Sequence, residues 1–252
     1  MTMVWSPDYE DAPATYIAAV EAADGQGLEE EVKAAYTEFI LGCISDGIWD
    51  AIKASCILAG ARTLAGALVP LKGVAPTNFN LSGYDRKLGL AGNPVNGRLL
   101  TSYTPLQNNN HGAVWLSSQP SVGYILLGNK DGAGFGFYPN TNVYVLANNT
   151  AGAFQVVSAG IQLTVGFVGI ERSSSASYTY RIGSLNGTTG SGNNSTTPLT
   201  TPVSVFAGDP AFRNGYPTDA RIPFYSLGES LDLALLDTRI SDFITAIGAA
   251  IP

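Results

Sequence analysis

The spacing of hydrophobic and polar residues changes twice along this chain. Between residues 13 and 60 the apolar residues recur at steps of three and four, which predicts amphipathic helices. From Pro76 to about residue 228 apolar and polar residues alternate, which predicts β-strands. The helical spacing then returns. We therefore expect an N-terminal helical segment in residues 1–71, a β-domain in residues 72–228 and a C-terminal helix in residues 229–252.

Three helices are expected in the N-terminal segment. The first begins at Pro13, because proline suits the first helical position, and it ends at Gly25. The third is expected from about Ser45 to Gly60 and would bury Trp49. The second has one apolar face, which is formed by Leu28, Val32, Tyr36, Phe39, Ile40 and Cys43.

The middle of the chain contains a series of short strand-like stretches, such as "HGAVWLSS" and "NVYVLANN". Turn signals such as Asp131-Gly132 and Asn186-Gly187 separate them. This spacing predicts an antiparallel β-sandwich of two sheets, with the polar stretch Ser184–Pro198 as a loop. The predicted fold is thus mostly β with helical additions.

The end of the chain reads as a last strand that leads into a helix. An apolar stripe runs from Leu231 to Ile247, and Ser226 and Glu229 have the spacing of a capping box. An amphipathic helix needs a surface on which to bury its stripe. We expect it to pack beside the sandwich, against the N-terminal helices.

Charge is scarce and unevenly spread. Charged residues make up 13% of the 252 residues, against a usual value of about 25%. Residues 1–71 contain eleven acidic and three basic residues. Residues 72–228 contain five acidic and nine basic residues, and residues 229–252 contain four acidic residues and one basic residue. Either the acidic helices form a solvated surface, or they meet a basic surface of another subunit. No dense cluster of Lys and Arg occurs in the middle, so no nucleic-acid partner is expected.

The two cysteines, Cys43 and Cys56, are expected to be small buried apolar residues, since neither lies in a CxxC pair. With a single histidine, this argues against a zinc site, and no other cofactor motif is present. The first residues lack the features of a signal peptide. The apolar run Ile57–Leu71 is too short and too interrupted to span a membrane.

A sandwich of this kind would suit a glycoside hydrolase, which needs two carboxylates that face each other. The acidic residues of the β-region do not form a close alternating pair, so a pair would have to form between distant strands; Asp131 and Glu171 are the best candidates. A Ser-His-acid triad would have to use His111, which we expect instead to cap a turn at the start of a strand.

Two further groups of residues have a structural and a functional interpretation. Asp209 and Asp219 flank the stretch "DPAFRNGYPTD", where they would either hold a Ca²⁺ ion or cap turns. Trp115, Tyr138 and Tyr144 lie on expected strands, where they would either fill the core or stack on sugar rings.

Both ends of the chain resemble known proteins. "ARIPFYSLGESLDLALLDTRISDFITAIG" resembles the closing segment of a family of tailed-phage and prophage virion proteins with a concanavalin A-like, or laminin G-like, jelly roll, and Ala18–Asn80 is similar to their helical leader. The expected strands in about Gly97–Thr201 resemble those proteins only in their general pattern of residues. The family motif RxxFYSxGESLDL falls on Arg221, Phe224, Tyr225, Ser226, Gly228, Glu229, Ser230, Leu231, Asp232 and Leu233.

The resemblance implies a virion component on the outer surface of the head or tail, and it supplies no catalytic residue. Three functions stay open. The first is a structural subunit without enzymatic activity, a homo-oligomer such as a trimer that contacts other virion proteins, with Phe39 and Trp49 needed for assembly. The second is a module that binds host-surface glycans, and the third is a glycoside hydrolase.

Overall fold

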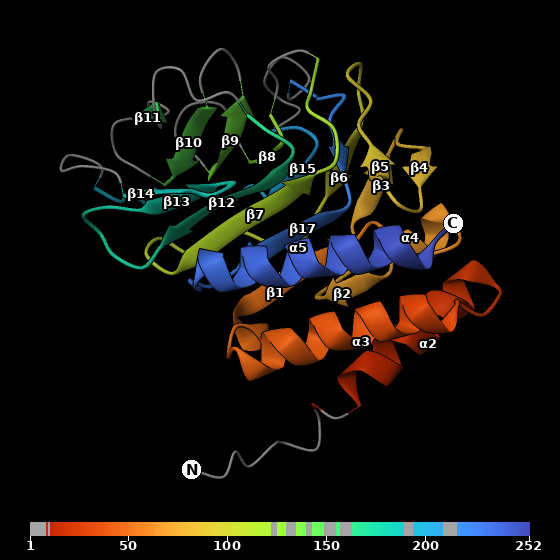
Figure 1. Ribbon diagram of the computed structural model, residues 1–252. Coiled ribbons are helices and arrows are strands. Elements are labelled where there is room, and N and C mark those ends of the chain that lie inside the picture. Colours follow the sequence, from red (N-terminus) through yellow and green to blue (C-terminus); the bar gives the residue numbers. More distant parts are fainter. Residues whose placement is uncertain are drawn as a thin grey trace, which may run out of the picture.

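The computed structural model shows two stacked β-sheets and a layer of helices that covers the outer face of one of them (Figure 1). We call the covered sheet A and the other sheet B. The structure describes residues 9, 11–121, 125–129, 135–139, 143–148, 155–156, 163–188, 194–208 and 216–252, without the side chains at 138–139, 143–144, 146 and 155–156.

Both large sheets have seven strands among the described residues. Sheet A has the order β14 (Leu185–Thr188), β13 (Thr179–Ile182), β12 (Gly166–Arg172), β7 (Asn110–Leu116), β17 (Phe224–Gly228), β1 (Ile52–Ile57) and β2 (Pro70–Lys72). Sheet B has the order β11 (Gln155–Val156), β10 (Val143–Ala147), β9 (Phe135–Pro139), β8 (Leu127–Gly128), β15 (Ser204–Val205), β6 (Arg98–Leu100) and β3 (Thr77–Phe79).

A small third sheet contains β16 (Arg221–Ile222), β5 (Gly89–Ala91) and β4 (Gly83–Asp85). The helices are α2 (Ala12–Asp24), α3 (Glu30–Ser45), the 3₁₀ turn η1 (Trp49–Ala51), α4 (Leu64–Ala67) and α5 (Leu233–Ala250). The strand pairs in the described part of the chain are antiparallel. The predicted antiparallel β-sandwich with added helices is thereby confirmed. None of the described helices is long and apolar enough to cross a bilayer.

Sheet A has a hydrophobic core on each side. One core lies between the two sheets and contains Val114, Ile170 and Phe137. The other lies between sheet A and the helical layer, a name we use for α2, α3 and α5 together. There Phe39 of α3 contacts Phe224 of β17, with ring centroids 5.5 Å apart, and Phe243 of α5 at 5.4 Å. The two ends of the chain therefore share one core.

Polar contacts fix the helical layer in place. Arg239 of α5 binds the Asp46 carboxylate at the end of α3 through two hydrogen bonds, of 2.7 and 2.8 Å. Arg86 makes a similar pair with Glu29, and these bonds lower the pKa of Glu29 to about 2. Such planar two-bond pairs define the orientation of both partners.

The expected third helix is wrong. Trp49 lies in the 3₁₀ turn η1, and Ile52–Ile57 form strand β1 between β17 and β2. All residues of β1 except Lys53 are buried. A strand that is buried on both faces presents a continuous apolar run, and such a run has no period that separates it from a helix. The segment 1–71 is therefore not wholly helical.

Two smaller predictions are also wrong. Asn186-Gly187 lies within β14, and the hairpin turn falls instead at Gly183-Ser184, where Gly183 has φ +54°. Ser226 lies within β17, and the N-cap of α5 is Asp232. In both cases a neighbouring residue of similar turn or capping type serves the purpose.

Candidate functional site

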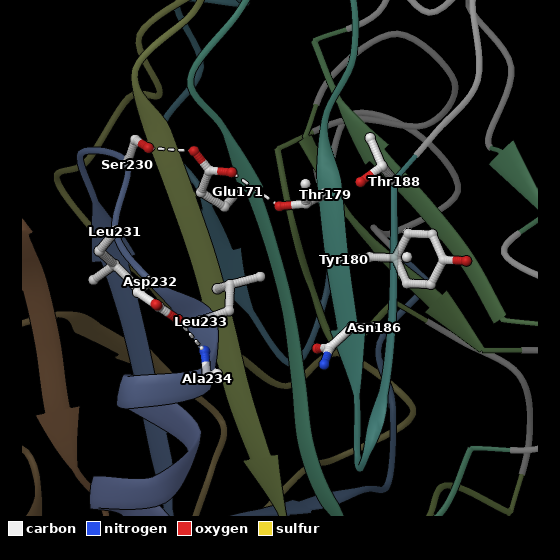
Figure 2. Close-up of a pocket in the computed structure, with 11 residues that line it drawn as sticks. Glu171, Thr179, Tyr180, Asn186, Thr188, Ser230, Leu231, Asp232, Leu233 and Ala234 are labelled. Carbon is white, nitrogen blue, oxygen red and sulfur yellow. Dashed lines mark hydrogen bonds between the residues drawn. The ribbon is translucent and has the colours of Figure 1, made fainter.

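A pocket opens on the outer face of sheet A, where β12, β13 and β14 run past the N-terminal end of α5 (Figure 2). Its volume is about 730 Å³. We call it the hydroxyl pocket, after the side chains that supply its polar groups: Glu171, Thr179, Asn186, Thr188, Ser230 and Asp232.

The strand register brings the first of these side chains together. Glu171 lies directly opposite Thr179, and Thr179 lies opposite Thr188 on the next strand. Directly opposed residues of antiparallel strands project from the same face of a sheet. Tyr180, the next residue along β13, projects from the other face, where its ring packs against the core between the sheets (Figure 2).

Gly187 makes room for that ring. A Cβ atom at residue 187 would lie 2.1 Å from the hydroxyl oxygen of Tyr180. Any side chain here would displace the tyrosine, since real Cβ contacts do not come this close. This explains why the Asn-Gly pair occurs inside a strand.

Glu171 is the most buried polar residue of the pocket, with 8% of its surface exposed. Its Oε2 atom accepts a hydrogen bond of 2.9 Å from the Thr179 hydroxyl, and its Oε1 atom accepts one from the Ser230 hydroxyl. None of the ion pairs between described residues includes Glu171. Its carboxylate is thus held at the pocket wall by two hydroxyl groups.

The start of α5 forms the opposite wall. The Oδ1 atom of Asp232 accepts hydrogen bonds from the backbone N–H groups of Ala234 (2.7 Å) and Leu235 (3.3 Å). Arg181 binds Asp237 at 2.7 Å and donates a hydrogen bond of 2.8 Å to Oδ1 of Asn186. These contacts leave Oδ2 of Asp232 as an acceptor and Nδ2 of Asn186 as a donor for a ligand.

His111 does not cap a turn, as the sequence suggested, but lies buried within β7. Its Nδ1 atom donates to the carbonyl oxygen of Glu229 at 2.5 Å, and its Nε2 atom accepts from the Ser226 hydroxyl at 2.8 Å. Burial disfavours the charged ring and lowers the pKa of His111 to about 4. Ser226 is also fully buried, so this pair fastens β7 to β17 in the protein interior and offers no nucleophile to the surface.

The other residues of the family motif also make structural contacts. Phe224 packs on Phe39, Tyr225 donates to the Cys56 sulfur at 3.3 Å, and Glu229 pairs with Lys53 at 3.1 Å. Arg221 donates hydrogen bonds to the carbonyl oxygens of Gly83 and Gly89.

Gly228 passes so close to β1 that a Cβ atom there would lie 1.9 Å from the carbonyl oxygen of Ala51. Leu231 packs against the helical core.

The residues expected to serve assembly lie inside the chain's own core. Phe39 is 3% exposed and Trp49 is 6% exposed, and both belong to the core under the helical layer. They are therefore not available to a partner subunit. The sequence shows that a face is apolar, but it does not show which surface covers that face.

The remaining candidates are dispersed. Trp115 is half-buried against the helical core and is not part of the hydroxyl pocket, while Tyr138 and Tyr144 lie on β9 and β10 without described side chains. The carboxylate of Asp219 accepts from the backbone N–H and hydroxyl of Ser121. Asp131 and Asp209 lie outside the described residues, and no group of three metal-binding side chains occurs among the described ones.

Sequence reasoning missed most of the pocket. Thr179 and Thr188 had no assigned role, and Asn186 was expected in a turn. Ser230 and Asp232 appeared only as residues of the motif, and Glu171 alone was a candidate for chemistry. The alternation in "SYTYRIGSL" does place Thr179 and Arg181 on one face. Their position beside Glu171 depends on the register between β12 and β13, which this stretch alone does not specify.

Several solved structures share this fold at low sequence identity. The binding domain of botulinum neurotoxin serotype D matches with a TM-score of 0.53 at 12% identity, over 77% of this chain and 51% of that chain. The receptor-binding domain of the C/D mosaic serotype matches at 0.52, also at 12% identity and with the same coverage. A Trypanosoma rangeli sialidase mutant with trans-sialidase activity matches at 0.50 and 14% identity, over 84% of this chain and 38% of that chain.

This chain thus spans about half the length of the toxin domains that it matches. No protein-family profile matches it, and no curated protein matches its sequence. The matches show a shared jelly-roll-like β-sandwich, as the sequence predicts, and they show the fold alone.

Proposed function

We propose that this chain is a non-enzymatic structural component of a tailed-phage virion that docks on other virion proteins or on further copies of itself. The outer face of the helical layer carries this proposal, because it is acidic and its cations are already engaged. The assignment to a virion rests on the resemblance at both ends of the chain. The motif residues support it, since they attach the helical layer to sheet A.

The helical layer carries many small exposed residues. Small side chains allow a partner to approach the helix backbones closely. The exposed alanines of the layer are Ala14, Ala18, Ala19, Ala22, Ala23, Ala34, Ala234 and Ala249.

The same face is negatively charged. Glu38 of α3 and Asp242 of α5 stand on the two sides of the groove between these helices, and both are exposed. Lys33 and Arg239 are the basic residues of the three helices. Lys33 binds Glu21 and Glu30 at 3.1 Å, and Arg239 binds Asp46. A partner surface that presents Lys or Arg side chains complements such a face, and an acidic one is repelled.

Charge reversal on this groove tests the proposal. The double variant Glu38→Lys, Asp242→Lys should keep the unfolding temperature of the wild type, because both side chains are exposed. Its amount in purified particles, measured by immunoblot, should fall about tenfold or more, since apposed like charges at an interface cost several kcal/mol.

The matched control places two lysines elsewhere. Val95 and Leu106 are 72% and 53% exposed, and the variant Val95→Lys, Leu106→Lys should enter particles normally. Equal incorporation of both double variants would show that the helical face is not the docking surface. Absence of the wild-type chain from particles would overturn the proposed function as a whole.

A further inference from the structure

The hydroxyl pocket takes no part in the docking proposed above. Its walls come from sheet A on one side and from the start of α5 on the other (Figure 2). We propose that it is a binding site for a neutral saccharide. This inference goes beyond the proposed function and does not depend on it.

The pocket has the size of a ligand site. Its volume of about 730 Å³ falls within the range of roughly 300–1,000 Å³ that is usual for small-molecule sites. It is open to solvent on one side, so it admits one end of a longer chain as well as a free sugar. Apolar surface is present too, because Leu231 lines the wall beside Asp232.

Its polar groups include both donors and acceptors. Oδ2 of Asp232 and the lone pairs that remain on Glu171 accept hydrogen bonds, while Nδ2 of Asn186 and the hydroxyl of Thr188 donate them. A sugar hydroxyl is both a donor and an acceptor, and a ring carries several of them. Hydrogen bonds from such hydroxyls to a carboxylate are of the stronger, charge-assisted kind.

Charge excludes the other common classes of ligand. Two carboxylates line the pocket, and Arg181, which contacts the pocket residue Asn186, is bound to Asp237 as well. Phosphates, sulfates and acidic sugars would therefore be repelled. An ammonium ligand would satisfy the carboxylates but offers no acceptor, so the amide of Asn186 and the hydroxyl of Thr188 would lose their water without replacement.

Contacts within the protein hold the polar side chains of the pocket in fixed orientations. Glu171 is oriented by hydroxyl groups from β13 and from Ser230, and Asn186 is oriented by Arg181. These contacts come from separate elements and set the side chains before any ligand arrives. Pre-set polar groups lose little conformational freedom on binding.

The experiment is a titration of the isotope-labelled full chain with neutral saccharides, followed by NMR. The panel contains glucose-, galactose-, mannose-, rhamnose- and N-acetylglucosamine-based mono- and oligosaccharides at millimolar concentration. Saturable shifts should appear at Glu171, Thr179, Thr188 and Ser230. Glu171→Gln and Asn186→Ala should each weaken binding about tenfold, the loss expected for one hydrogen bond to a charged or oriented group.

Two further variants separate binding from folding. Thr188→Trp fills the pocket from an exposed strand position and should abolish the shifts, with an unchanged unfolding temperature. Thr245→Ala lies on the exposed face of α5 outside the pocket and should bind as the wild type does. The proposal is overturned if no member of the panel binds, or if Thr188→Trp still binds.

Discussion

Two regions on the same face of sheet A differ in what covers them. In β12, Phe167, Gly169 and Glu171 alternate along one face. Phe167 is 1% exposed in the core beneath the helical layer. At Gly169 a Cβ would lie 3.0 Å from a methyl group of Leu233, where α5 begins. Glu171, one step further, lies beyond the helix and lines the hydroxyl pocket.

The difference shows that coverage, and not the strand itself, decides the chemistry of each position. Where α5 lies over the sheet, the row of opposed residues is apolar and includes Ile57, Phe224 and Trp115. Where the helix is absent, the corresponding row is Glu171, Thr179 and Thr188. Burial of apolar surface makes the first row contribute to the stability of the fold. In the second row, solvent or a ligand forms hydrogen bonds with the polar side chains.

The covered region should be the more sensitive to substitution. Phe39→Ala removes a buried ring that contacts both Phe224 and Phe243. We expect the free energy of unfolding to fall by about 3–5 kcal/mol, because both the transfer energy and a cavity contribute. Urea denaturation monitored by circular dichroism measures this. A loss below about 1 kcal/mol would mean that the helical layer is not tightly packed on sheet A.

Acid should destabilise the folded chain through His111, which is buried within β7. Its pKa is about 4 in the folded chain and returns to its ordinary value of 6.5 on unfolding. Between these values the unfolded chain binds more protons, so stability falls as the pH drops from about 6.5 to about 4, by up to about 3 kcal/mol. Unfolding temperatures measured across this range provide the test.

The control for that acid effect is His111→Gln, which keeps polar groups near Ser226 and Glu229 but does not titrate. Its unfolding temperature should change less steeply than that of the wild type between pH 6.5 and pH 4, whatever its absolute value. Parallel curves for the two proteins would contradict the assignment of this step to His111.

Two glycines provide a matched pair. Gly228→Ala places a methyl group against the carbonyl oxygen of Ala51 and should cost about 1–3 kcal/mol, because the backbone must shift. Gly248→Ala meets no atom within 4 Å in the interior of α5 and should stabilise the chain by up to about 1 kcal/mol. Thermal unfolding of both variants gives the comparison, and a neutral Gly228→Ala would mean that β1 and β17 are less closely apposed.

The open region should tolerate change. Thr188→Ala removes an exposed hydroxyl from the wall of the hydroxyl pocket and should change stability by less than about 0.5 kcal/mol. A large loss of stability would show instead that the pocket wall is part of the folded core. Calorimetric unfolding distinguishes the two results.

The sequence predicts the covered region better than the open one. The apolar stripes of α3 and α5 follow from helical spacing, and the alternation from Pro76 onward predicts the sandwich. The prediction from sequence fails for β1, because a strand with two buried faces shows no alternation of apolar and polar residues. It also assigns Phe39 to assembly, because an apolar face in the sequence does not show whether its own chain covers it.

The residues of the open region are far apart in the sequence, and only the pairing of the strands brings them together. Glu171 and Thr188 are brought together by the registers of two hairpins, and the turn of the second hairpin, β13–β14, was predicted at the wrong residues. Ser230 reaches Glu171 only because β17 and β12 both flank β7. The pocket therefore depends on how the strands pair, and the sequence alone does not bring its residues together.

The most direct test of the proposed function is immunogold labelling of intact phage particles with an antibody against this chain, viewed by electron microscopy. We predict label on the particle surface, on the head or on the tail, and loss of that label with the Glu38→Lys, Asp242→Lys variant. Particles that carry no label, and that contain none of the chain by mass spectrometry, would contradict the account.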